Sequence, residues 1–221
     1  MTRMLIAGGC SWTSQFIYKK YGIWTWPHLV AEKMGLKLLN IGQHGASNDH
    51  IRNVLFDAMI EYKDDDPIVM VLWTDPKRAN INDMCSEFKT APEFRDEHGF
   101  LIDPEEYPYL SIKGGLRNIW MCRNLAEQFN LDYVDLLGCW YIPHKSTEQP
   151  EYQTTLSKIK KDWYFKKLGF NLREVEHGLT LNVNPISEND PHPNQENQEM
   201  FAEMMINKYN QRFVKPEYIY D

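Results

Sequence analysis

The stretch RMLIAGGCSWT, residues 3–13, joins a short apolar run to a pair of glycines and a serine. The apolar run over residues 3–7 predicts a buried strand, and the glycine pair marks a break directly after it. Glycines allow the chain to turn sharply, so Ser11 is expected just past the end of this strand.

The rest of the chain alternates between strand-like and helix-like patterns. Further strands are predicted over residues 36–40, 68–73, 131–137 and 179–183. Helices are predicted from Thr25 to a stop at Gly35, behind an N-cap at Ser47, over 115–130, through the basic cluster 158–167, and over 194–213. This alternation predicts an α/β protein whose parallel sheet is covered by helices on both faces. Ligands are then expected at the carboxyl ends of the strands.

Nothing in the sequence reads as a linker or an internal repeat, so a single domain over residues 1–221 is predicted. Residues 75–113 are rich in Pro, Asp and Asn and predict an insertion over the top of the sheet. A second insertion is predicted near residues 138–175, where many aromatic residues gather.

The chain carries 31 Asp and Glu against 24 Lys and Arg, a net charge of −7. This balance argues against nucleic-acid binding, which needs a basic face. No apolar run approaches the roughly 20 residues that cross a bilayer, so no membrane contact is predicted. The N-terminus has no signal-peptide core, and the four widely spaced cysteines predict reduced thiols and no metal site.

Two interpretations of Ser11 follow from its place after the strand. It can act as a nucleophile, because a following helix would aim backbone N–H groups at developing negative charge. Alternatively, the glycine pair simply makes a turn and Ser11 caps a helix.

Two later segments have a similar double interpretation. NIGQHGASN, residues 40–48, follows the second strand and has two glycines that allow close backbone approach to a ligand; it can also be an ordinary capped loop. ENDPHPN, residues 188–194, holds His192 between two prolines, with Asp190 near enough to orient the imidazole. The alternative is a proline-rich turn whose Asn194 caps the last helix.

Together these segments resemble the SGNH (GDSL-like) hydrolase superfamily. That family has a serine after the first strand, a glycine after the second, an asparagine after the third, and Asp and His near the C-terminus. Residues 9–11 resemble the serine block, residues 40–47 the glycine block with Gly45 as oxyanion donor, and residues 190–194 the terminal block. The Gly-Cys-Ser-Trp-Thr form of residues 9–13 is similar to versions encoded by bacteriophages.

The resemblance implies a three-layer α/β/α sandwich with a flavodoxin-like parallel sheet. It also implies a serine esterase that removes acyl groups from a carbohydrate or a small ester. Ser11 would attack the carbonyl carbon, His192 would take the serine proton, and Asp190 would orient His192. This chemistry requires no metal and no organic cofactor. The phage-like form implies a location in the host cytoplasm or in the virion.

The chain departs from the family pattern in three respects. Cys10 replaces the usual Asp before the serine, and its side chain is not the nucleophile. Asp75 stands in place of the oxyanion-hole asparagine, where an ionised carboxylate would repel an oxyanion. Asp190 and His192 are separated by one residue, whereas the family usually has two between them.

The expected oxyanion hole therefore consists of the N–H groups of Ser11 and Gly45, with Thr74 as a further donor and the side chain of Asp75 turned aside. Trp12 and Arg78 are candidate substrate contacts. For the tryptophan the alternative is core packing, and for the arginine it is a surface ion pair.

The departures from the pattern also leave a second function open. In this alternative, the chain is a catalytically weak or inactive protein of the same fold that binds glycans or forms part of a virion.

Overall fold

The computed structural model describes residues 2–76, 78, 107–138, 140, 150–179 and 183–212. Most of the insertion predicted near residues 75–113 lies outside these ranges, as does part of the one near 138–175. Within them, four strands form a parallel sheet in the order β2-β1-β3-β4. The strands are β1 (Met4–Gly9), β2 (Lys37–Asn40), β3 (Ile68–Trp73) and β4 (Asp132–Leu137).

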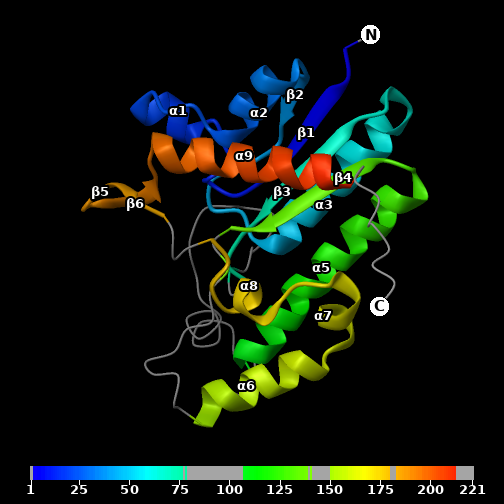
Figure 1. Ribbon diagram of the computed structural model, residues 1–221, viewed down its shortest axis with the longest axis vertical. Coiled ribbons are helices and arrows are strands. Elements are labelled where there is room, and N and C mark those ends of the chain that lie inside the picture. The colour runs from blue at the N-terminus through cyan, green and yellow to red at the C-terminus, as the bar shows by residue number, and fades with distance from the viewer. Residues whose placement is uncertain are drawn as a thin grey trace, which may run out of the picture.

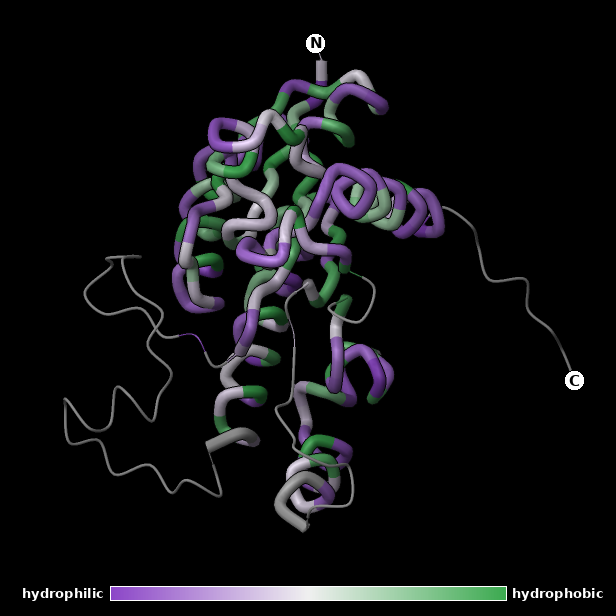
Figure 2. The backbone as a smooth tube through the Cα atoms, turned by 90° about the vertical axis from the view of Figure 1, so that its left-hand side faces the viewer, coloured by the Kyte–Doolittle hydropathy of each residue, from purple (hydrophilic) through white to green (hydrophobic). Residues whose placement is uncertain are grey.

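Helices cover both faces of this sheet (Figure 1). On one face, α2 (Trp26–Met34) packs against α9 (Gln195–Gln211), and on the other α3 (Asn48–Tyr62) packs against α5 (Tyr107–Gln128). The view turned by 90° places α9 and α3 on opposite sides of the strands, with hydrophobic segments concentrated between them (Figure 2). The predicted three-layer α/β/α architecture is confirmed.

The two central strands explain why this architecture forms. Every residue of β1 and of β3 is buried. A strand covered on both faces needs a continuous apolar run, and its backbone groups need partners on both edges. β1 finds these partners in β2 and β3, and β3 finds them in β1 and β4.

Short-range signals fix several helix ends where the sequence predicts them. α2 has Thr25 at its N-cap and Gly35, with φ of 64°, at its C-cap. Ser47 caps α3 by accepting a hydrogen bond from the backbone of His50, and Asn194 caps α9 by accepting one from the backbone of Asn197. These caps set where the loops between strands and helices begin and end.

Two predicted boundaries are wrong. α5 begins at Tyr107, not near residue 115, so the first insertion contributes the first two turns of a long helix. The basic cluster 158–167 is helical but is divided at Asp162, which follows α6 (Pro150–Lys161) and caps α7 (Trp163–Leu168). Both helices pack against α5, and α8 (Leu172–His177) follows them along the chain.

The predicted strand over residues 179–183 falls partly outside the described residues. Leu179 donates its backbone N–H to the carbonyls of Leu137 and Gly138 at the end of β4. Two short strands follow instead, β5 (Pro185–Ser187) and β6 (Asp190–Pro193), which pair antiparallel with each other in a sheet of their own.

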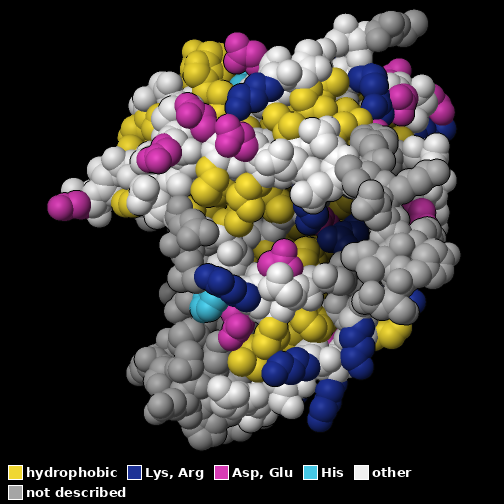
Figure 3. Space-filling view, viewed as in Figure 1, with side chains coloured by type: hydrophobic (Ala, Val, Ile, Leu, Met, Phe, Trp, Pro, Cys, Tyr) yellow, Lys and Arg dark blue, Asp and Glu magenta, His cyan; other side chains and the backbone are white. Residues whose placement is uncertain are grey.

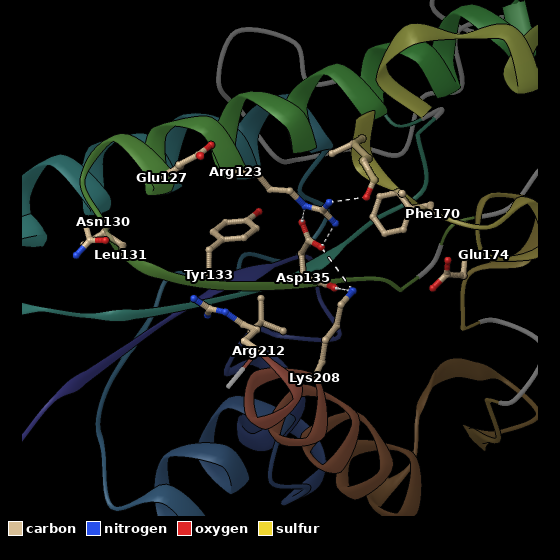
Figure 4. A pocket seen from close by; sticks show the side chains of 13 residues that line it. Arg123, Glu127, Asn130, Leu131, Tyr133, Asp135, Phe170, Glu174, Lys208 and Arg212 are labelled. Atoms are coloured by element: carbon tan, nitrogen blue, oxygen red, sulfur yellow. Dashed lines mark hydrogen bonds and ion pairs between the residues drawn. The ribbon is translucent and has the colours of Figure 1, made fainter. Parts of the chain in front are cut away.

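A cavity of about 650 Å³ lies along the outer edge of β4, between α5, α9 and the α7–α8 connection. Figure 3 shows the hollow below α9 with basic side chains in it, and Figure 4 shows the ion pair that lines it. Arg123 of α5 donates to both oxygens of Asp135, at 2.6 and 3.0 Å, and to the carbonyl of Leu168 at 2.7 Å. Lys208 of α9 donates to the backbone carbonyl of Asp135. The pair therefore joins a strand to the helices on both of its faces.

Asp135→Asn tests this ion pair. We expect the free energy of unfolding to fall by about 2 kcal/mol, because Arg123 keeps its place but loses its anionic partner. The loss is smaller than for a fully buried pair because 29% of the Arg123 side chain is exposed. Urea unfolding measures the change, and Glu127→Gln, an exposed site on the same helix, is the control. Equal effects of the two substitutions would contradict this role for the pair.

Candidate active site

The turn after β1 places Ser11 at the carboxyl end of the sheet. The backbone N–H groups of Thr13 and Ser14 both donate to the carbonyl of Cys10, at 2.9 and 3.1 Å, which closes the chain around Ser11. A side chain at Gly9 would come within 2.1 Å of the Thr13 hydroxyl, so only glycine fits there. Ser11 is 3% exposed.

The loop after β2 is tied to this turn by hydrogen bonds. Asn40 donates its side-chain amide to the carbonyl of Thr13 at 2.8 Å and accepts the N–H of Gly42 at 2.9 Å. Gln43 donates its N–H to the carbonyl of Gly9 at 3.1 Å. Gly45, the predicted oxyanion donor, lies further along this loop with a φ of 73°, in the left-handed region that favours glycine.

The third strand end is held by a buried amide. Asn48, at the start of α3, donates to the carbonyl of Thr74 and accepts the Thr74 N–H, at 3.1 and 3.0 Å. The hydroxyl of Thr74 is buried and has no hydrogen-bond partner in the described part of the chain. Asp75 accepts the N–H of Arg78 with its backbone carbonyl at 3.1 Å. A buried hydroxyl thus lies next to Asp75, and its role as an oxyanion donor stays a prediction.

Asp190 and His192 form a hydrogen-bonded pair. The Asp190 Oδ1 lies 2.5 Å from His192 Nδ1 and also accepts the His192 backbone N–H at 3.1 Å. Both residues belong to β6, and alternate residues of a strand point to the same face. The extended backbone of β6 therefore makes a separation of one residue sufficient for the hydrogen bond between Asp190 and His192.

Two residues that the sequence analysis missed hold the other oxygen of Asp190. The Tyr21 hydroxyl donates to Asp190 Oδ2, and Lys20 Nζ lies 3.5 Å from the same atom. Both stand at the end of α1 (Phe16–Tyr21). The Tyr21 hydrogen bond, with those from His192, holds the pKa of Asp190 well below its usual range. No local sequence pattern signals this contact, since 169 residues separate the partners.

Aromatic contacts join the loop after β2 (residues 41–47, the glycine loop) to the Asp190–His192 pair. The rings of His44 and His192 have centroids 6.0 Å apart, and Phe16 lies 4.6 Å from His44 and 6.2 Å from His192. Burial lowers the pKa of His44, and the nearby charges of His192 and Arg78 lower it further. The imidazole of His192 therefore faces the loop that carries Gly45.

The two candidate substrate contacts differ in position. Trp12 is 8% exposed and stacks on Phe201 with centroids 5.6 Å apart, an arrangement that favours core packing. Arg78 is half-buried and close enough to His44 to influence its pKa.

The structure thus brings three strand-end segments and β6 toward one edge of the sheet. Asp190 and His192 are in contact. Ser11 lies in the tightly closed turn, and among the described hydrogen bonds none joins its hydroxyl to His192. Ser11, Asp190 and His192 thus lie on neighbouring segments, with the aspartate and the imidazole in direct contact.

Several solved structures share this fold. A psychrotrophic esterase, EstA from Pseudoalteromonas sp., matches with a TM-score of 0.52 and 14% identity over 96% of this chain and 100% of that one. A variant of Axe2, an acetyl-xylooligosaccharide esterase from Geobacillus stearothermophilus, matches with a TM-score of 0.51 and 13% identity over 95% of both chains. A putative lipolytic protein of the G-D-S-L family from Desulfitobacterium hafniense has a TM-score of 0.49 and 14% identity, covering 96% of this chain and 99% of that one. The matches to EstA and Axe2, both with TM-scores above 0.5, show that the chain shares the fold of these two proteins.

No protein-family model and no curated protein matches the sequence. Among the helices that the structure describes, we find none with the length and apolar character needed to span a bilayer.

Gly42→Ala tests the close contact between the first two loops. An added Cβ would lie 2.7 Å from Thr13 Cγ2 and 3.0 Å from the Ser14 backbone nitrogen. We expect the loops to be forced apart and the free energy of unfolding, measured with urea, to fall by about 2 kcal/mol, because an added methyl group strains a tightly packed contact. Gly114→Ala is the control, because nothing lies within 4 Å of its added Cβ. Equal unfolding free energies for Gly42→Ala and Gly114→Ala would show that the contact between the loops is not tight.

Proposed function

We propose that this protein is a serine esterase of the SGNH type. The observation that carries the proposal is the Asp190–His192 pair, with Nδ1 and Oδ1 2.5 Å apart, at the sheet edge where the Ser11 turn ends β1. An acid that holds one nitrogen of an imidazole leaves the other nitrogen free to act as a base. The fold shared with EstA and with the acetyl-xylooligosaccharide esterase supports the same chemistry.

In the proposed mechanism, Ser11 Oγ attacks the ester carbonyl while His192 Nε2 accepts its proton. Asp190 accepts the Nδ1–H and stabilises the imidazolium that forms. The N–H groups of Ser11 and Gly45 donate to the oxyanion, with the Thr74 hydroxyl nearby as a third donor. His192 then protonates the leaving alcohol, and a water activated in the same way releases the acid and regenerates Ser11.

The missing hydrogen bond between Ser11 and His192 is compatible with this mechanism. Catalytic hydrogen bonds are often long in the free enzyme and shorten only when substrate is bound. The aromatic contacts of His192 with Phe16 and His44 leave it on the side of the glycine loop. In the proposed mechanism, substrate binding brings the imidazole of His192 within hydrogen-bonding distance of Ser11.

We infer that the substrate is a small ester or an acylated carbohydrate, acetyl esters included. Axe2, which has the same fold, is an acetyl-xylooligosaccharide esterase, and the present chain spans the length of that protein. We further propose that residues 1–221 act as one domain. The phage-like Gly-Cys-Ser-Trp-Thr form of residues 9–13 supports an intracellular origin in an infected host or a place in the virion.

A second candidate function is favoured by Asp75. A carboxylate at the donor position opposes an oxyanion, so the chain would then bind an acylated glycan without cleaving it. Labelling with a fluorophosphonate distinguishes the two functions, because only an activated serine reacts with it. An esterase should be labelled, and a protein that only binds a glycan should not.

Ser11→Ala tests the esterase directly. We expect wild type to hydrolyse p-nitrophenyl acetate, and the variant to lose at least a thousandfold in kcat because its nucleophile is gone. A fluorophosphonate should label wild type at the peptide that contains Ser11. Cys10→Ala should keep both the hydrolysis and the label, which separates the serine from its neighbouring thiol. Equal rates for wild type and Ser11→Ala would remove Ser11 from the mechanism.

Asp75→Asn tests the oxyanion hole. If the carboxylate is turned aside, the substitution should leave hydrolysis nearly unchanged, and if the new amide reaches the oxyanion it should raise kcat. One oxyanion donor is typically worth ~3 kcal/mol. The rates are compared at equal Ser11-dependent labelling, so that folding differences cancel. A hundredfold loss would show that the carboxylate itself has a catalytic task.

A further inference from the structure

The end of α1 contributes the contacts that fix the carboxylate behind His192. The two carboxylate oxygens of Asp190 have different partners. Oδ1 accepts the backbone N–H of His192 and lies against its Nδ1, while Oδ2 accepts a hydrogen bond from the Tyr21 hydroxyl. Lys20 Nζ lies 3.5 Å from Oδ2, and its side chain is 51% exposed, so solvent screens most of that attraction. The tyrosine is therefore the principal contact on this side of the carboxylate.

From this geometry we propose that Tyr21 is a positioning residue for the acid–base pair of the esterase, an inference that rests on the proposed function. None of the described hydrogen bonds joins Tyr21 to Ser11 or to the proposed oxyanion donors. It acts through Asp190, by keeping Oδ1 aimed at His192 Nδ1.

The strand that carries the pair needs such an anchor. β5 and β6 form a two-stranded ribbon with no hydrogen bonds to the main sheet among the described residues. A two-stranded ribbon is marginally stable by itself. The described contacts that hold it at its base include the Asn184 N–H, which donates to Asn197 of α9 at 2.6 Å, and the Asn194 N–H, which donates to the Asn184 carbonyl. Neither of these reaches the carboxylate of Asp190.

Tyr21 also links the acid to the nucleophile. α1 begins directly after the Ser11 turn, where the Ser14 hydroxyl accepts the N–H of Phe16. A hydrogen bond from the last residue of α1 to Asp190 therefore sets the distance between the segment that carries Ser11 and the strand that carries His192. It further keeps the carboxylate ionised, since a donor to the charged form stabilises that form.

The first experiment compares Tyr21→Phe with wild type in Ser11-dependent ester hydrolysis. We expect kcat to fall about tenfold with KM unchanged, because a hydrogen bond to a charged group is lost but no substrate contact is. Tyr18→Phe is the matched control on the same helix: Tyr18 is 40% exposed and packs on Trp24. It should leave both constants unchanged. A wild-type kcat in Tyr21→Phe, with activity still dependent on Ser11, would overturn the positioning role and leave the esterase standing.

A double-mutant cycle with Asp190→Asn separates positioning from general damage. If Tyr21 acts through the carboxylate, Tyr21→Phe should cause little further loss once Asp190 is already Asn. Equal fold-losses in the two backgrounds would show that Tyr21 works independently of Asp190 and would overturn the proposal.

Thermal stability as a function of pH tests the contact between Tyr21 and Asp190 even if the protein is not an esterase. The hydrogen bond from Tyr21 lowers the pKa of Asp190 in the folded protein. The bond therefore stabilises the fold fully above the pKa of an unfolded Asp, about 4. This stabilisation is lost as the pH falls toward the lower pKa that Asp190 has in the folded state. The groups that face the carboxylate are Tyr21 and Lys20 from α1 and His192 from β6. The Tm of Tyr21→Phe should lie below that of wild type at pH 7, and the gap should narrow below about pH 4. No gap, or the same gap at every pH, would overturn the proposal.

Discussion

Parallel pairing of β1 with its two neighbours is the constraint on which the rest of this structure depends. Because β1 and β3 are buried on both faces, each must pair along both edges, and all the pairings are parallel. Parallel strands end at the same side of a sheet, so the loops after β1, β2 and β3 have to meet. Hydrogen bonds from Asn40 to Thr13 and from Asn48 to Thr74 then lock these loops together. The position of the candidate site is thus set by the parallel pairing of the strands, whichever side chains the loops carry.

Local signals account for the parts of the fold that the sequence predicts. The bounds of β3 coincide with its apolar run, and the caps Thr25, Gly35 and Ser47 stand where α2 and α3 begin or end. Each of these features depends on residues a few positions apart. The start of α5 does not, because Tyr107–Gly114 shows no apolar periodicity and α6 and α7 pack against this helix. β5 and β6 were missed for a similar reason: their proline-rich sequence resembles a turn, and the ribbon is held by α9.

The candidate site follows the same division. The sequence points to Asp190 and His192 through their types and their nearness, and the strand geometry adds why one intervening residue is enough. Tyr21 could not be found in this way, because its partner is 169 residues distant. Trp12 shows the opposite case. A tryptophan beside a serine suggests a ligand contact, yet the indole stacks on Phe201 from the last helix. Which side of a turn a residue faces is decided by packing that no short motif encodes.

The ribbon β5–β6 lies outside the main sheet. The stability of the Asp190–His192 pair can therefore differ from the stability of the sheet. The central strands share their hydrogen bonds with neighbours on both edges, whereas the described contacts of the ribbon with the rest of the chain run through a few side chains and its junction with α9. Regions with few such contacts open at a lower free energy than the core. Asp190 and His192 therefore lie on a segment that is expected to open more readily than the central strands. The Asp190–His192 pair can thus come apart and form again while the main sheet stays folded.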